Sequence, residues 1–298
     1  MNLPCGEALK QLQRQIERQI INLTNSSQGG TDYDRPAGDP GLFGPGSVCW
    51  KVHGDFPVMI CGGISALMLQ MMHPLALAGV WDHSNFRADM LGRLRRTSQF
   101  VGGTTFGPTA AAKQLINKVQ RIHDQVQGIA PDGRPYSAND PALLRWVHVA
   151  EHYGFLSSYL RYGPEELSLA EQDQYFDEVA LIAEALGATQ VPRSRPAVER
   201  YLQEMQPELV YDERTAEVMS LLLAAPTPNW MTKPAGYLVT QAAVDLLPDW
   251  ARATAGLKQP WPKQQAIRLA MQGLAQVLRS SVRNGASQRA KRRVGELG

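Results

Sequence analysis

Six histidines carry most of the chemistry that this sequence can offer, and His123 stands apart from the others. It follows Val119 by four residues and precedes Val126 by three, so it shares the apolar face of a helix expected over residues 109–127. A neutral imidazole on such a face can ligate a metal through one ring nitrogen, as the proximal histidine of a haem protein does. The alternative is a core histidine bonded to a backbone carbonyl. Helix position alone leaves both interpretations open.

The remaining histidines give weaker signals. His73 ends a long uncharged helix just before Pro74, where it either caps backbone carbonyls or contacts a cofactor. His148 and His152 lie one helical turn apart, a spacing that can serve a metal. The stretch HVAEH lacks the HExxH order of a zinc peptidase, so we interpret the two as a partly exposed pair beside Glu151.

A basic cluster follows the uncharged helix. Arg93, Arg96 and Thr97 are spaced i, i+3 and i+4, so they share one helix face that we expect to be partly buried. Burying guanidinium groups is costly unless anions pair with them. Those anions are either carboxylates of this chain, such as Asp82 and Asp89, or carboxylates of a ligand. The two propionates of haem are ligands that arginine binds well, and Thr97 adds a hydroxyl.

The uncharged segment itself covers residues 56–81 and contains no Asp, Glu, Lys or Arg. Its length approaches that of a membrane span. Gly62-Gly63, Gln70 and His73 interrupt its apolar character, and Pro74 should break or kink a continuous helix. We therefore expect a helix enclosed in the core of a protein without transmembrane segments.

Composition narrows the function classes. The 298 residues are 44% hydrophobic and 19% charged, with a formal net charge of +2. This balance excludes a disordered chain and argues against a nucleic-acid binder. The three cysteines show no CxxC spacing, which suits a reducing cytosol and excludes a disulfide scaffold. No hydrophobic stretch precedes the first charges, so we expect no secretory signal and a cytoplasmic protein.

The pattern predicts an all-α protein, a single multi-helix globular domain around the uncharged helix. There is no sustained period-2 alternation, phosphate loop or dinucleotide fingerprint. We expect an N-terminal amphipathic helix over 1–28, the main helical domain over 29–285 and a basic flexible tail over 286–298. Gly102-Gly103 and Gly107-Pro108 should break the chain. Helices are expected near 56–73, 86–100, 109–127, 140–162, 168–187, 195–205, 212–225, 234–247 and 261–283.

Two helix starts are marked by capping residues. Asp140 is followed by Pro141, which favours an N-cap and the first helical position. Ser168 and Glu171 form a capping box. Residues 29–48 are crowded with Gly, Pro and Asp and read as a long loop.

Several sequence blocks occur in an order that resembles a known family. They are GDPGLFGPGSVCWKV, the uncharged helix running into MHPLALAGVWDHS, RLRRTSQFVGGTTFG, VQRIHDQVQG, YSANDPALLRWVHVA and YLVTQAAVDLLPDWAR. Together they resemble the DUF2236 family, the rubber-oxygenase catalytic domain, over roughly residues 38–255. That family includes the latex-clearing proteins and the fungal oxygenase of mycophenolic acid biosynthesis.

The resemblance implies a globin-like helical core that binds haem b and uses O2 to cleave a carbon–carbon double bond. His123 would be the proximal iron ligand. Arg93, Arg96 and Thr97 would match the family's Arg-x-x-Lys-Thr stretch on the distal side, where they would hold propionates or polarise oxygen. His73 would contact the residues that bind the cofactor and would not ligate the iron itself. Arg96 replaces the family's lysine, and arginine stays protonated and does not readily ligate iron.

A second departure from the family concerns a carboxylate. The acidic residue proposed as a base in latex cleavage has no counterpart in residues 56–81, so we do not expect a long polymer as substrate. The leading hypothesis is a haem b-dependent oxygenase that acts with O2 on a small lipophilic substrate such as an isoprenoid. The alternatives are a non-catalytic haem or lipophile carrier and a cofactor-free helical interaction protein. The sequence names no electron donor.

Overall fold

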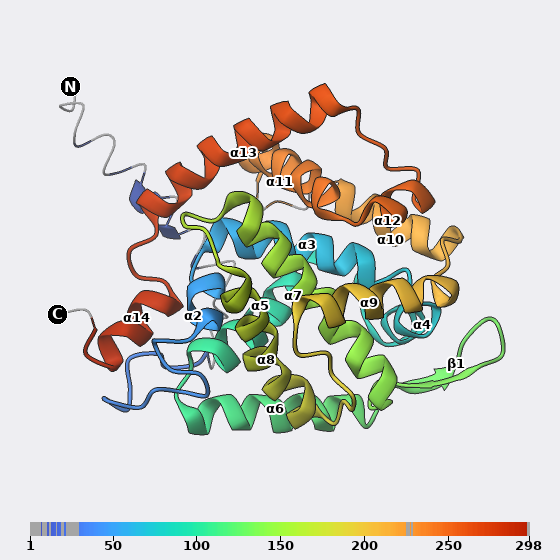
Figure 1. Ribbon diagram of the computed structural model, residues 1–298, viewed down its shortest axis with the longest axis horizontal. Helices are drawn as coiled ribbons and strands as arrows, with labels where there is room; N and C mark the ends of the chain where they lie inside the picture. Colours follow the sequence, from blue (N-terminus) through green and yellow to red (C-terminus); the bar gives the residue numbers. More distant parts are fainter. Residues whose placement is uncertain are drawn as a thin grey trace.

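The computed structural model describes residues 30–224, 227 and 229–296, together with Glu7, Gln11, Gln13 to Gln15, Glu17, Arg18 and Ile21. The described chain is mostly helical and forms one compact domain (Figure 1), which confirms the all-α prediction. The expected helix over 1–28 lies largely outside the described residues. In chain order the elements are α2 (Val48–His53), α3 (Phe56–Gln70), α4 (Pro74–His83), α5 (Met90–Phe106), α6 (Thr109–His123), β1 (Gln127–Ile129), β2 (Pro135–Ser137), α7 (Pro141–Tyr162), α8 (Leu169–Leu186), α9 (Arg195–Met205), η1 (Gln206–Glu208), α10 (Glu213–Leu223), η2 (Trp230–Thr232), α11 (Lys233–Leu246), α12 (Asp249–Thr254), α13 (Trp261–Ser281) and α14 (Ala286–Arg293).

Helices α3 and α7 form the central pair, and two glycines let their backbones touch. A Cβ atom added at Gly62 would lie 2.7 Å from the carbonyl oxygen of Gly154. One added at Gly154 would lie 2.5 Å from the carbonyl oxygen of Gly62. No side chain fits between the two backbones, so glycine is required for this close approach. The crossing therefore fixes the distance between the two central helices.

The uncharged segment forms two helices that are separated just before Pro74, where the sequence predicted a break or kink. Pro74 occupies the first turn of α4, and His73 Nδ1 accepts a hydrogen bond from the Leu75 backbone N–H at 3.2 Å. α3 and α4 meet at 104°, and within the described residues no single helix is long and apolar enough to cross a bilayer. The side chains of Val58 and Met68 are fully buried. The expectation of a core helix is thus confirmed for α3.

The other helices pack around the central pair in two groups. α11 and α13 lie against α3 on one side, along the upper edge of Figure 1, while α6 and α8 lie toward the lower edge. The first group closes on Asp245 of α11, whose side chain is completely buried. It accepts hydrogen bonds from Arg161 Nη1 at 2.6 Å and Arg268 Nε at 2.7 Å, and Arg252 lies 3.4 Å away. Every charge in this cluster is paired.

The largest differences from the predicted helix boundaries are in α5 and α6, and α5 begins at Met90 where we expected residue 86. α5 continues through Gly102-Gly103 and ends at Phe106. Gly103 lies at the contact of α5 with α6, where a Cβ would lie 2.2 Å from the end of the Leu115 side chain. α6 ends at His123, since the chain turns into a hairpin in which β1 pairs antiparallel with β2. Its turn uses Gly133 with φ of +85°, a conformation that favours glycine.

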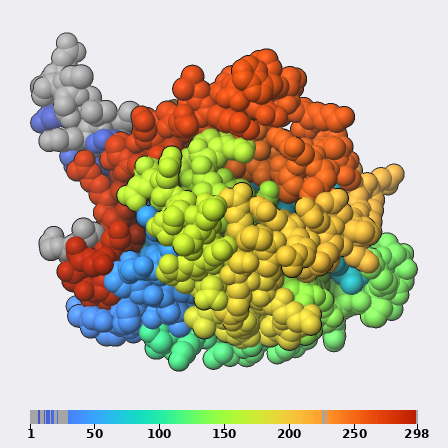
Figure 2. Space-filling model, in the orientation of Figure 1, coloured from blue at the N-terminus to red at the C-terminus, as the bar shows by residue number. Residues whose placement is uncertain are grey.

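The C-terminal segment also departs from expectation. Residues 286–293 form α14 where we expected a flexible tail. Only 4% of Arg293 is exposed, and its guanidinium donates to the carbonyl oxygens of Tyr33, Phe106 and Asp39 at 2.7 to 2.9 Å. Figure 2 shows the same neighbourhood, with red C-terminal residues against blue residues from early in the chain. The helix α2 and the short α12 were also not predicted.

Candidate functional site

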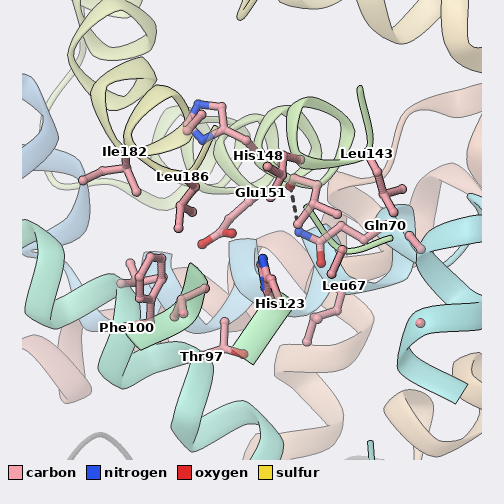
Figure 3. Close-up of a pocket in the computed structure, with 18 of the residues that line it drawn as sticks. Leu67, Gln70, Thr97, Phe100, His123, Leu143, His148, Glu151, Ile182 and Leu186 are labelled. Atoms are coloured by element: carbon pink, nitrogen blue, oxygen red, sulfur yellow. Dashed lines mark hydrogen bonds between the residues drawn. The ribbon is translucent and has the colours of Figure 1, made fainter. Parts of the chain in front are cut away.

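A cavity of about 660 Å³ lies between α3, α4, α5, α6, α7 and α8. Its volume falls within the range of small-molecule and cofactor sites, roughly 300–1,000 Å³. Figure 3 shows the side chains that project into it. Most are apolar: Leu67, Leu75, Val80, Phe100, Val101, Val119, Ile122, Val126, Leu143, Leu144, Val147, Val179, Ile182 and Leu186. The cavity therefore suits a lipophilic occupant that meets a few polar groups.

His123 is one of those polar groups. It is the last residue of α6, half-buried, and its ring points into the cavity (Figure 3). Within the described chain neither ring nitrogen makes a hydrogen bond, and Nδ1 is fully enclosed. Burial lowers the pKa of His123, although Asp124 opposes the shift, so the ring is neutral near pH 7. No backbone carbonyl of the described residues bonds to this imidazole, which leaves its lone pair free for another partner.

Arg93 lines the same cavity without a compensating anion. Its Nη1 donates to the Ser84 hydroxyl at 3.1 Å, and no described carboxylate lies within ion-pair distance. Burial, and secondly the charge of Arg96, lower the pKa of Arg93 to about 10. Asp82, a candidate partner, instead accepts a hydrogen bond from the Tyr136 hydroxyl at 2.6 Å. The Arg93 guanidinium thus remains available for an anion from outside the chain.

Arg96 and Thr97 also line the cavity, but at its exposed edge. Arg96 Nη1 lies 3.5 Å from Asp89 Oδ2, and its side chain is 62% exposed. The Thr97 hydroxyl donates to the Arg93 carbonyl oxygen at 3.3 Å and is also exposed. The structure therefore brings the three predicted distal residues to one cavity, with only Arg93 unpaired.

The opposite wall holds a residue that the sequence analysis did not select, Glu151 of α7. It continues the cavity-lining stripe of Leu143 and Val147 at intervals of four residues. Burial raises the pKa of Glu151 to about 7. A carboxylate that continues an apolar i, i+4 stripe was the signal available in the sequence.

Of the pair that we expected to be partly exposed, His148 is half-buried and His152 is buried. Burial lowers the pKa of His148 to about 3. The two rings are in contact, with centroids 4.3 Å apart and planes tilted by 52°. The Tyr175 hydroxyl lies 2.9 Å from His152 Nδ1 and 2.8 Å from His53 Nε2, so it donates to one imidazole and accepts from the other. This network ties α7 to α8 and α2, and thereby positions the cavity wall that carries Glu151.

The remaining predicted residue, His73, does not line the cavity. Its Nδ1 caps α4 and its ring packs near Trp146 with centroids 5.9 Å apart. Burial lowers the pKa of His73 to about 4. The capping role is the one that the structure describes, at the start of α4 instead of at the end of α3. A role toward a cofactor stays a prediction that no contact supports.

The comparison with protein families gives one result. The family model described as ER-bound oxygenase mpaB/B'/Rubber oxygenase, catalytic domain, matches residues 50–280. These residues include the whole of α3, α4, α5, α6, α7 and α8, which supply most of the cavity lining. Neither a curated protein nor a solved structure matches the chain.

Proposed function

This chain belongs to the mpaB and rubber-oxygenase catalytic-domain family, a family of oxygenases, and on that premise we propose that it is a haem b-dependent oxygenase. In this proposal O2 oxidises or cleaves a carbon–carbon double bond of a small lipophilic substrate, with isoprenoids as the first class to test. The observation that carries the proposal is the cavity-facing imidazole of His123, whose nitrogens have no partner in the described chain.

The donor set supports an iron porphyrin more than a bare metal ion. No group of three His, Cys, Asp or Glu side chains in the described chain could hold a metal. A single protein ligand suffices when a macrocycle fills the other positions, as in proteins with one proximal histidine. His123 offers that ligand at the end of α6 as a neutral ring, because burial lowers its pKa.

The electrostatics support the same group. Haem carries two propionates, and Arg93 provides a partly buried guanidinium that lacks a carboxylate. Arg96 lies at the exposed edge of the same cavity. It would bind a propionate together with Arg93 once its ion pair with Asp89 is broken. The apolar side chains of α6, α7 and α8 suit the porphyrin ring and a lipophilic substrate.

Bound haem would supply the iron centre at which O2 is activated. The chain's own residues bind and orient. His123 holds the iron, Arg93 fixes the propionate edge, and the apolar walls exclude water from the reacting double bond. Arg96 stays protonated and contributes charge, not ligation. A reducing cytosol is the setting that the cysteine content predicts.

The visible spectrum of the purified protein, with and without dithionite, tests the cofactor directly. We expect a Soret band that shifts on reduction, and its loss in His123→Ala. The matched control is His83→Ala, because His83 lines the same cavity but is exposed, and its Nε2 donates only a long hydrogen bond to the Gln127 carbonyl oxygen at 3.3 Å. A full Soret band in His123→Ala contradicts the ligand assignment.

One observation favours a second candidate, a haem or lipophile carrier without turnover. Arg96 and Thr97, the residues that match the family's distal stretch, are exposed and already paired within the chain. Oxygen uptake by the holoprotein with a lipophilic alkene separates the two functions. Uptake in proportion to added alkene supports the oxygenase, and a stable ligand complex without uptake supports the carrier.

A further inference from the structure

Among the described residues that line the cavity, Glu151 supplies the only carboxyl group. The surroundings of Glu151 indicate which class of substrate this group would contact. Glu151 extends into the cavity from α7. In the view of Figure 3 its carboxyl oxygens lie between the side chains of Phe100 and His123. Leu143 and Val147 precede Glu151 on the same face of α7 and are apolar, while His148 and His152 of α7 also line the cavity. The facing residues of α8 are apolar as well.

Glu151 has no internal partner. Within the described part of the chain its side chain makes no hydrogen bond and no ion pair. The Gln70 amide, which lies nearby in Figure 3, is committed to the Val147 carbonyl oxygen at 2.9 Å. The guanidinium of Arg93 is bonded to Ser84. A structural role through polar contacts is therefore absent from these residues.

An enclosed carboxyl group without a partner selects against a hydrocarbon. A purely apolar occupant would exclude water from Glu151 and leave its polar atoms unsatisfied, which costs binding free energy. Because burial raises the pKa of Glu151 to about 7, the neutral carboxyl is well populated at physiological pH. In that form it donates one hydrogen bond and accepts others. A hydroxyl group has the same pair of capacities and adds no charge to an apolar site.

The wall behind Glu151 is rigid enough to specify such a contact. His152, the next residue on α7, bonds to Tyr175 of α8, and Tyr175 bonds to His53 of α2. Trp146 Nε1 bonds to the Gln70 carbonyl oxygen of α3 at 3.3 Å. These contacts hold α7 from three sides, so the carboxyl extends from a fixed backbone into the cavity.

We propose that Glu151 is the anchor for a substrate hydroxyl, and hence that this protein takes unsaturated lipophilic alcohols in preference to hydrocarbons of the same skeleton. The inference rests on the proposed oxygenase function for the reaction that follows, but the binding contact stands without it. Glu151 acts here as a specificity-determining residue. The double bond then lies at a set distance from the hydroxyl, which restricts where oxidation occurs.

Calorimetric titration of the purified full-length protein tests the proposal, with geraniol and farnesol as alcohols and myrcene as the hydrocarbon. In Glu151→Leu we expect the alcohol-over-hydrocarbon preference to fall by about tenfold, the effect of losing one hydrogen bond. Glu151→Gln should keep most of the preference, because an amide also donates and accepts. Val147→Ala, on the same stripe, is the control and should change both affinities alike.

Three results overturn the proposal. They are an unchanged preference in Glu151→Leu, an absence of alcohol binding to the wild type, and tighter binding of geranylamine than of geraniol, lost in Glu151→Gln. The last would mean that a carboxylate pairs with a cation. Haem content, measured on every sample, separates this inference from the proposed function. If protein without haem shows an alcohol preference that depends on Glu151, the contact is supported and the oxygenase function is contradicted. If protein with haem shows no such preference, only the contact is contradicted.

Discussion

Two groups of ionisable side chains in this molecule differ in whether the chain itself supplies their partners. The Asp245 cluster, formed by Asp245 with Arg161, Arg252 and Arg268, joins α11 to α7, α12 and α13. Burial alone would raise the pKa of Asp245, but the hydrogen bond from Arg268 and the charge of Arg161 outweigh it, and the pKa is lowered. The charge of Asp245 is therefore paired entirely within the chain.

The cavity groups Arg93, His123 and Glu151 lack such partners. Arg93 has only a hydroxyl, and the described chain offers neither His123 nor Glu151 a hydrogen bond. Buried polar groups in folded proteins are normally satisfied, so each exception calls for an explanation. The comparison separates ionisable groups that hold the fold together from ionisable groups that lack a partner in the described chain and are available to a ligand.

Breaking the Asp245 cluster should have the largest effect. Asp245→Ala leaves three arginines without their shared anion and should destabilise the protein by about 3–5 kcal/mol. Urea unfolding followed by circular dichroism measures this change. Asp249→Ala is the control, since the Asp249 side chain is 93% exposed and its pair with Arg252 should contribute below about 1 kcal/mol. A loss of less than about 1 kcal/mol in Asp245→Ala would remove the contrast.

Neutralising Glu151 should stabilise the protein at high pH. The unfolded carboxyl titrates near 4.5 and the folded one at about 7, so the folded state holds a proton that the unfolded state has lost. Stability therefore falls as pH rises from 4.5 to 7 and stays reduced above it. Glu151→Gln escapes this loss and should be more stable than the wild type by at most about 3 kcal/mol at pH 8.

The same measurement at pH 5 should show a much smaller difference between Glu151→Gln and the wild type. Glu166→Gln, at an exposed glutamate on the loop after α7, is the matched control and should leave stability unchanged at both pH values. An equal effect of Glu151→Gln at pH 5 and pH 8 would mean that its carboxyl is not enclosed.

Replacing Arg93 should cost the fold little and the cofactor more. Arg93→Gln removes a charge that no anion compensates, so the apoprotein should change by less than about 1 kcal/mol. Loss of the propionate contact should weaken haem retention by about tenfold, measured as transfer to an excess of apomyoglobin. Arg121→Gln, at an exposed arginine of α6, should alter neither quantity.

The smallest effect on stability belongs to His123. His123→Ala removes a half-buried ring that makes no hydrogen bond, so the apoprotein should keep its unfolding free energy to within about 0.5 kcal/mol. A large destabilisation of the apoprotein would make His123 a structural residue. His123 would then no longer belong to the cavity groups that are available to a ligand.

Local signals in the sequence predicted most helix starts. Asp140 caps α7 through the backbone N–H groups of Ala142 and Leu143, and Ser168 with Glu171 forms the expected capping box. Such signals act over four residues and need no knowledge of the rest of the fold. They failed at Gly103, where a glycine that reads as a breaker serves close packing of α5 on α6.

The site was predicted only in part, for a related reason. Helical spacing placed His123 toward the interior and grouped Arg93 with Arg96 and Thr97. It gave no information on which group would find a partner, because pairing depends on residues distant in the chain. Glu151 was overlooked for that reason, since only the packing of α7 against α8 and α3 encloses it.

The contact between Gly62 and Gly154 has a consequence for anyone who wishes to alter this protein. α3 and α7 supply two walls of the cavity, and their backbones touch at these glycines, so any larger residue there would push the two walls apart. Ile182 and Leu186 of α8, by contrast, meet the cavity through side chains alone. Libraries aimed at bulkier compounds should therefore diversify α8 and leave the glycine crossing untouched.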